Sequence, residues 1–277
     1  MSVRSGQPGI NVEEYKLLPI NLPTLPEQEK IATFLSAVDS SIEQLSKKEQ
    51  LLRSYKKGVM QKIFSREIRF TPSTSSGNGK TENSVTEPVE VEDGGVFEDW
   101  VEKKLKDIAT FYNGKAYTQK ELLDKGKYRV LRVGNFFTNN HWYYSDLELD
   151  DNKYCDNGDL LYAWSASFGP RIWQGDKVIY HYHIWKVIPS KDITKDFLFT
   201  ILDNETEQMK SQSANGFALL HITKGTIEEW KINLPSLPEQ TKIANFLSSL
   251  DKQIAQVSEQ LAEKKDFKKG LLQKMFV

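Results

Sequence analysis

The chain has 277 residues with nearly balanced charges, 37 Lys and Arg against 38 Asp and Glu. This balance counts against a DNA-binding protein held by bulk positive charge, so recognition of nucleic acid would have to be local. A mean hydropathy of −0.53, no apolar run long enough to span a membrane and no signal peptide lead us to expect a cytoplasmic protein. The single cysteine, Cys155, excludes an internal disulfide and a cysteine-rich zinc site.

The chain begins with a polar segment, residues 1–19, that is too short for a domain. Residues 20–69 then open with a proline-punctuated stretch, INLPTLPEQ, and continue as a long periodic run. Thr24 is a good N-cap with Glu27 as its capping-box partner, and Pro26 falls in the first turn, where its missing N–H removes no helical hydrogen bond. The pattern predicts a helical arm over residues 20–69.

This segment occurs twice. Ile20–Phe64 reappears without a gap as Ile232–Phe276 at an offset of about 212 positions, with roughly 24 of 45 residues identical. Ser236 and Glu239 repeat the N-cap and its partner. Residues 231–277 are therefore predicted to form a second helical arm.

Apolar residues in both arms alternate four and three positions apart, which is the heptad seam of a helix that pairs with another helix. The seam residues, which we expect to serve helix pairing and partner docking, are Ile31, Leu35, Val38, Ile42, Leu45 and Leu52 in the first arm and Ile243, Leu247, Leu250, Ile254, Val257 and Leu261 in the second. Each helix should span roughly 38 residues, or about 57 Å. The alternative is a helix packed on the core of its own domain, but two matched copies around a different domain favour helix-on-helix pairing.

The polar seam positions suggest a register for that pair. Glu49 in the first arm and Lys264 in the second carry opposite charges. An antiparallel pair that joins them also places Leu52 near Leu261.

Between the arms lie a linker and an aromatic-rich domain. Residues 70–96 are rich in Ser, Thr, Gly and Glu, which predicts a flexible linker or an irregular connection. Residues 97–230 contain short strands bounded by turn residues, expected at Tyr128–Val133, Asp159–Trp164, Arg171–Trp173, Val178–Tyr180 and Ile184–Ile188, and a helix near Lys195–Ser211. No strand alternates regularly with a helix, so a nucleotide-binding parallel sheet is not expected. The predicted fold class is α+β, one mixed α/β domain plus two long antiparallel coiled-coil helices.

Catalytic motifs are incomplete in this chain. GNGKT at residues 77–81 resembles the end of a phosphate-binding loop, but Thr74 stands where that loop needs glycine. Asp93, Glu102 and Lys104 can be fitted to the carboxylate-lysine spacing of a nuclease. Glu102, however, belongs to a charged run that is typical of a solvated face. The Asn/Asp-Pro-Pro-aromatic loop of base methylation is missing. No catalytic residue is predicted.

Two histidines stand at strand spacing, His181 and His183 in YHYHIW, which predicts that they share one face. Alternate histidines can bind a metal, but no second cluster of ligands accompanies them, so no metal site is predicted. Surface positions or contacts with DNA are the roles expected for them.

Side chains that read base edges or pack beside nucleotides gather in the loops of the middle domain. The candidate DNA-binding residues are Asn113, Lys115, Arg132, Asn135, Trp164, Ser165, Ser167, Arg171, His181, Tyr182, His183, Gln212, Asn215 and Lys224. Any one of these loops is more often an ordinary turn. Their concentration favours recognition of DNA.

The doubled INLPxLPEQ-x-KIAxFLS segments, each running to KKG-xx-QK-x-F at Lys56–Phe64 and Lys268–Phe276, resemble the conserved regions of Type I restriction-modification specificity subunits. A weaker resemblance covers Trp100, Leu105, Gly114 and the turn at residues 158–161. It implies that residues 97–230 form a target-recognition domain that reads one half of a split DNA sequence. The paired helices would hold two such domains apart and dock methyltransferase subunits.

The resemblance also implies a non-catalytic chain whose partners are double-stranded DNA, methyltransferase subunits and a motor-nuclease subunit. S-adenosylmethionine, ATP and magnesium would belong to those partners, with no cofactor in this chain. A different class remains open, a coiled-coil assembly protein that scaffolds a complex without reading DNA. A third is an enzyme with an unrecognised site.

The sequence departs from the family at its start, where a first recognition domain would precede the first arm. Residues 1–19, with SGQPGI at Ser5–Ile10, resemble the remnant of that domain, so we expect a half-size or N-terminally truncated subunit. Either both arms pair within one chain, or two copies associate so that identical domains face a symmetric split site.

Overall fold

A computed structural model describes residues 2–4, 7–9, 12–17, 22–70, 98–137, 140–165, 169–213 and 222–275. The chain divides into two compact units, one made of Met1–Tyr55 with Asp251–Val277 and the other of Lys56–Leu250. Two long helices, α2 (Leu25–Phe64) and α7 (Leu237–Met275), contribute residues to both units. Within the described residues, no helix has the length and apolar character needed to cross a membrane.

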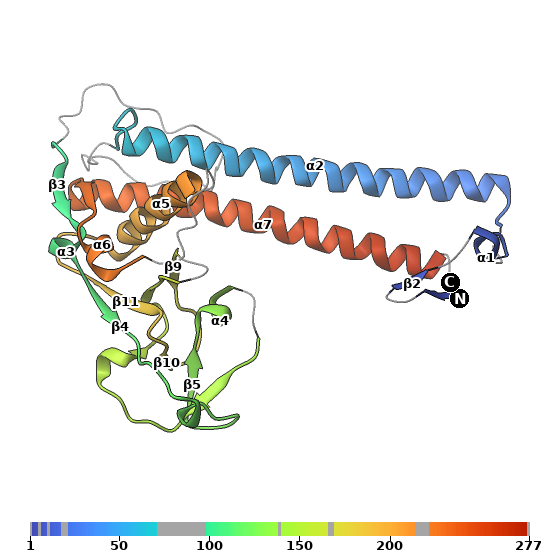
Figure 1. The fold of residues 1–277 in the computed structure, drawn as a ribbon. Helices are drawn as coiled ribbons and strands as arrows, with labels where there is room; N and C mark the ends of the chain where they lie inside the picture. The colour runs from blue at the N-terminus through green and yellow to red at the C-terminus, as the bar shows by residue number, and fades with distance from the viewer. Residues whose placement is uncertain are drawn as a thin grey trace. The chain divides into compact units, whose positions relative to one another are not determined.

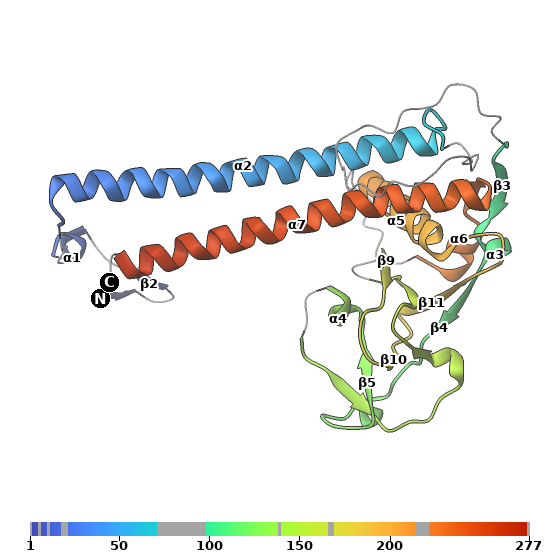
Figure 2. The same cartoon turned by 180° about the vertical axis from the view of Figure 1, so that it is seen from behind.

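The first unit is a pair of antiparallel helix segments (Figures 1 and 2). Lys268 of α7 forms an ion pair with Asp39 of α2, and Ser258 of α7 donates a hydrogen bond to the Glu49 carboxylate of α2 over 2.7 Å. The contact nearer the start of α2, at Asp39, is made with the residue nearer the end of α7, Lys268, so the two helices run antiparallel. The unit also contains β1 (Ser2–Arg4), paired antiparallel with β2 (Gln7–Gly9), and α1 (Val12–Lys16).

The register predicted for this pair is wrong by nearly one heptad. Glu49 lies opposite Ser258 rather than Lys264 and is also held by Arg53 of its own helix. These two hydrogen bonds lower the pKa of the Glu49 carboxyl, with Ser258 as the larger cause. The heptad repeat allows any shift of seven residues to keep the apolar seam, so seam pattern alone does not fix the register.

The second unit holds the middle domain. Its elements are β3 (Val101–Lys104), α3 (Leu105–Ile108), β4 (Ala109–Asn113), η1 (Gln119–Glu121), β5 (Tyr128–Leu131), α4 (Val133–Phe137), β6 (Tyr143–Ser145), η2 (Asp151–Lys153), β7 (Tyr154–Cys155), β8 (Leu160–Ala163), β9 (Gly169–Ile172), β10 (Val178–Tyr180), β11 (Ile184–Pro189), α5 (Lys195–Ser213), α6 (Lys224–Glu228) and β12 (Lys231–Leu234). Among the described strands, two four-stranded sheets run in the orders β6-β5-β10-β7 and β4-β11-β8-β9, and β12 pairs with β3. All of these pairings are antiparallel except β5 with β10.

The five predicted strands and the predicted helix are confirmed as β5, β8, β9, β10, β11 and α5, with ends shifted by a few residues at most. The mixed helix-and-sheet class is confirmed as well. Strands β3, β4, β6, β7 and β12 were not predicted; β6 and β7 have only three and two residues, too few to show a period. The predicted linker lies outside the described residues except for Phe70, and the domain boundaries stay a prediction.

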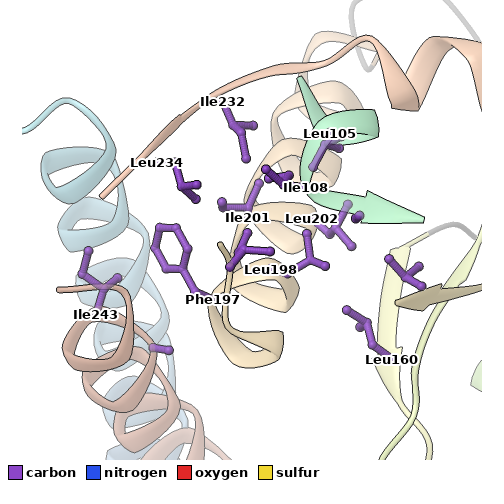
Figure 3. Packing of buried hydrophobic residues seen from close by; sticks show 14 of the residues in the cluster. Leu105, Ile108, Leu160, Phe197, Leu198, Ile201, Leu202, Ile232, Leu234 and Ile243 are labelled. Carbon is purple, nitrogen blue, oxygen red and sulfur yellow. The ribbon is translucent and has the colours of Figure 1, made fainter. Parts of the chain in front are cut away.

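The core of this unit forms around the apolar face of α5. Phe197, Leu198, Ile201 and Leu202 turn toward α3 and β12, as Figure 3 shows, and all four are almost completely buried. The sheet β4-β11-β8-β9 lines the same cluster with residues such as Leu160. A second cluster contains the buried Cys155, and burial raises the pKa of its thiol, as suits a packing role.

The predicted seam of α7 divides between two environments. Ile243, Leu247 and Leu250 belong to the core of the second unit, where Val59 and Ile63 of α2 join them. Ile254, Val257 and Leu261 are buried in the first unit, whereas on α2 Val38 is buried and the seam residues Ile31, Leu35, Ile42, Leu45 and Leu52 are half-buried. Packing on the domain core therefore applies to the first turns of α7, and pairing of helices applies beyond them.

The start of α7 is fixed to the domain by two adjacent side chains. The Glu239 carboxylate accepts two hydrogen bonds from Arg69, at 2.6 and 2.9 Å, and one from the Trp100 indole N–H at 3.1 Å. Gln240 donates to the carbonyl of Asp192 and accepts from the N–H of Thr194, both over 2.9 Å. The Glu239 carboxylate thus bonds to Arg69 and Trp100, which are distant in the sequence. These contacts are not the capping box with Ser236 that the sequence predicted.

The corresponding residues of the first repeat have different surroundings. Gln28 donates to the carbonyl of Pro23 over 2.8 Å, just as Gln240 donates to that of Pro235 over 2.9 Å. Glu27, the counterpart of Glu239, is exposed. The local bond at the helix start is therefore shared, whereas among the described residues the ion pair with Arg69 forms at the start of the second copy.

We expect Glu239→Gln to destabilise the protein by about 3 kcal/mol, because breaking a buried ion pair leaves its partner, Arg69, without the charge that offsets its desolvation. Glu239 and Arg69 expose only 4% and 15% of their side chains. The free energy of unfolding from urea denaturation measures the effect. The matched control is Glu27→Gln at the same place in the repeat, which should change stability by less than about 0.5 kcal/mol; equal effects of the two would contradict the assignment.

Candidate nucleic-acid interface

The candidate interface is built around a tight turn at residues 181–183 that joins β10 to β11. His181 donates its N–H to the carbonyl of Leu131, and Ile184 donates to the carbonyl of His181, each over 2.9 Å. The two histidines were predicted to lie on one face of a strand; instead Tyr182 and His183 form the turn itself. The imidazole centroids of His181 and His183 are nevertheless 4.9 Å apart, because the turn folds one beside the other.

The segment after β4 is pinned against this turn. Lys115 donates its N–H to the carbonyl of Tyr180 over 2.9 Å and accepts from the N–H of Tyr182 over 3.0 Å. A Cβ on Gly114 would lie 2.3 Å from the carbonyl oxygen of Tyr180 and 2.4 Å from that of His181, far inside van der Waals contact. Glycine is therefore required for the two backbones to approach each other.

Beside the turn lies a pocket of about 210 Å³, lined by Arg132, Val133, Gly134, Asn135, His141, His181 and His183. Four of these residues were singled out from the sequence as candidate DNA contacts: Arg132, Asn135, His181 and His183. The tertiary structure brings them together from two separate stretches of chain. His141 was missed, although it opens an aromatic run, HWYY, which is the kind of signal that singled out the YHYHIW stretch.

Aromatic rings pack against the other side of the turn. The indole N–H of Trp164 donates to the carbonyl of Tyr182 over 2.8 Å, and the Trp164 ring meets the His183 ring edge-on with centroids 4.9 Å apart. Trp164 also stacks on Trp185 at 5.7 Å, and the Trp185 indole donates to the Asn113 side-chain oxygen. Tyr182 is exposed, so this aromatic group reaches the surface.

No Asp or Glu side chain is among the residues that line the pocket. Burial holds the pKa of the His181 imidazole down to about 4, and the neighbouring His183 and Arg132 add to the effect. Within the described residues, the Arg132 guanidinium forms no ion pair, and it lies over the Tyr143 ring at 5.1 Å from the ring centroid. Glu121, in a neighbouring segment, pairs with Lys115 at 3.1 Å and accepts from the Thr118 N–H, which together lower its pKa.

The remaining candidates lie apart from this pocket or outside the described residues. Ser165 is buried, Arg171 is exposed on β9 opposite Leu161, and Lys224 opens α6 with its amine 3.5 Å from Glu228. Ser167 and Asn215 are outside the described residues, and Gln212 lies in α5 with its side chain not described. The GNGKT segment and Asp93 are outside them too.

The described residues contain no group of three or more His, Cys, Asp or Glu side chains placed to hold a metal ion. The three histidines of the pocket are therefore not arranged as a metal centre. Their chemistry is that of hydrogen-bonding and stacking groups beside an arginine, the types of side chain that contact nucleic acids.

The described residues form a mixed helix-and-sheet domain and a pair of long antiparallel helix segments. A family model described as the Type I restriction modification DNA specificity domain matches residues 1–53 and 97–264, which is most of the chain. The chain therefore belongs to this family. The resemblance noted in the sequence is confirmed.

Individual relatives agree. The MjaVIII specificity subunit of Methanocaldococcus jannaschii is 28% identical over 263 residues, covering 89% of this chain and 58% of the relative, and the putative MjaX specificity subunit of the same organism is 27% identical over 257 residues, covering 88% and 55%. The crystal structure of the S subunit from M. genitalium superposes with a TM-score of 0.55 at 18% identity, covering 92% of this chain and 62% of that one. The HsdS subunit from Thermoanaerobacter tengcongensis gives 0.50 at 17% identity, covering 99% and 64%. The chain thus spans less than two thirds of the length of each.

We expect Gly114→Ala to destabilise the protein by about 1–3 kcal/mol, because the added methyl collides with carbonyl oxygens that are themselves held by hydrogen bonds. The midpoint and slope of urea unfolding measure the loss. Gly58→Ala in α2 is the control, since its Cβ meets nothing within 4 Å and a helical alanine should stabilise by up to about 1 kcal/mol. A Gly114→Ala protein as stable as the parent would contradict the close approach.

Proposed function

We propose that this chain is a DNA sequence-recognition component of a Type I restriction-modification complex. The family match over residues 97–264 carries the proposal, because that span contains every residue lining the pocket and the aromatic groups beside it. The relatives' names describe specificity subunits, which agrees with this role. In this proposal the domain contacts DNA in its grooves, and the chain acts in the cytoplasm.

Catalysis belongs to other proteins in this proposal. Methyltransferase subunits would transfer the methyl group to adenine, a motor-nuclease subunit would cleave the DNA, and this chain would direct both to their site without a reaction of its own. The helix pair α2 and α7 would dock the methyltransferase subunits. Exposed apolar side chains on α2 that suit such docking are Phe34, Leu51 and Tyr55.

The finer proposal concerns symmetry. One domain of the kind formed in the second unit presents one reading surface, so a split site with two halves needs two such surfaces. Two copies of this chain would supply them, and their identical domains would face an inverted repeat.

The deciding experiment is to sequence methylated adenines in cells that carry this gene with its methyltransferase. The proposal predicts one methylated motif that disappears when the gene is deleted, and an inverted repeat if two copies act together. An asymmetric split motif in a cell with no second specificity protein would contradict the homodimer alone. No change of methylation on deletion would contradict the function itself.

Binding to DNA should keep its sequence preference as salt rises. Contacts with phosphates weaken steeply with salt for any sequence, whereas contacts with base edges preserve a ratio between target and random duplex. We expect Tyr182→Ala to weaken binding to the target by about tenfold, since burying an aromatic side chain against the sugars and base edges of a groove contributes roughly 1.5–3 kcal/mol. Fluorescence anisotropy with target and scrambled duplexes measures both, and Tyr112→Ala, another exposed tyrosine on β4, is the control.

A further inference from the structure

We propose that the pocket lined by Arg132, His141, His181 and His183 holds a phosphodiester group of the bound DNA backbone. This inference rests on the proposed function and goes beyond it, because it assigns one chemical group of the DNA to one pocket. It also gives a role to His141, which the sequence did not single out.

The charge of the pocket favours an anion. Its lining combines an arginine with three imidazoles and includes no carboxylate. Glu121, the acid near Lys115, is already bound by the Lys115 amine and by the N–H of Thr118. An anion that enters therefore meets a guanidinium whose charge no described carboxylate neutralises, and such charge-assisted hydrogen bonds are among the strong ones in proteins.

The pocket lining offers hydrogen-bond donors from the Arg132 guanidinium and from imidazoles. The Asn135 side chain has both ends engaged, since its oxygen accepts from the N–H of Arg132 at 3.2 Å and its nitrogen donates to the carbonyl of His141 at 2.8 Å. His181 accepts the N–H of His183 at Nδ1 over 3.5 Å. A neutral imidazole that accepts at Nδ1 carries its proton on Nε2, so His181 also offers a donor.

A phosphodiester fits this set better than a base edge does. Phosphate oxygens only accept hydrogen bonds, whereas every base pair presents a donor as well as acceptors in the major groove. The pocket volume of about 210 Å³ is several times the roughly 30 Å³ that one water occupies, which leaves room for the phosphate with its ester oxygens. Contacts of this type set the register of a protein on the duplex, so the pocket would position the domain rather than read sequence.

The test uses the full chain with target duplex and scrambled duplex over a range of salt. Arg132→Gln should weaken binding to both duplexes by a similar factor, roughly tenfold, as expected for a hydrogen bond to a charged group. The slope of log affinity against log salt should fall by about one, the effect of one lost phosphate contact. Arg132→Lys should keep most of that slope because it keeps the charge.

Two controls accompany these variants. Lys231→Gln removes an exposed cation that pairs with Glu102 at 2.9 Å; Lys231 lies on β12, which belongs to a different sheet from β5 and β10, and its loss should leave the slope unchanged. Urea unfolding of each variant confirms that the fold is intact, which is expected because Arg132 is exposed. His141→Ala, tested the same way, should weaken binding to the target duplex and to the scrambled duplex by a similar factor.

A scan of the duplex with neutral methylphosphonate linkages then identifies the phosphate. One position should weaken binding of the parent protein and have no further effect on Arg132→Gln, because the two changes remove the same contact. If Arg132→Gln instead alters the preference at one base pair with the salt slope unchanged, the pocket reads a base and the phosphate assignment is wrong. If the parent chain shows no preference for any sequence, the proposed function fails rather than this site.

Discussion

The ion pair between Glu239 and Arg69 is the interaction on which the second unit depends. One carboxylate at the start of α7 accepts hydrogen bonds from Arg69 and from the Trp100 indole, and Arg69 in turn donates to the carbonyl of Glu98 over 2.8 Å. Arg69 and Glu98 lie on either side of residues 71–97 in the sequence, so one buried charge ties both of these parts of the chain to the start of α7. Gln240, the next residue, binds Asp192 and Thr194 and so holds the segment before α5 against the start of α7. A buried carboxylate is tolerated only when such partners surround it, so removing any one of them leaves buried charge or polar groups uncompensated.

The two repeats show how one sequence acquires two roles. Both start a helix beyond a proline-rich stretch, and Gln28 and Gln240 make the same local bond to a carbonyl five residues back. Yet Glu27 is exposed and Glu239 is buried, because the start of the second helix packs against Arg69 and Trp100. The seam behaves likewise: Ile243 lies in the domain core and its counterpart Ile31 is half-buried.

The candidate interface depends on a close approach of backbones that the domain core makes possible. Gly114 lets the segment after β4 lie against the turn at residues 181–183, and that turn carries two histidines to the pocket. Arg132 and Asn135 arrive from the end of β5, since β5 pairs with β10 directly before the turn. The site is therefore a product of strand pairing, and the same pairing buries His181 enough to keep its imidazole neutral near pH 7.

The sequence by itself determined the two long helices, their starting points, five strands of the domain and the family. These follow from periodicity, capping residues and turn residues, which act over a few positions and are visible in one dimension. It also picked out Arg132, Asn135, His181 and His183 by type. Only the tertiary structure decided that these four share a pocket with His141, that Ser165 is buried, and that Glu49 faces Ser258. Those outcomes depend on which distant segments meet, and a heptad seam or a short strand satisfies several pairings equally well until the whole core selects one.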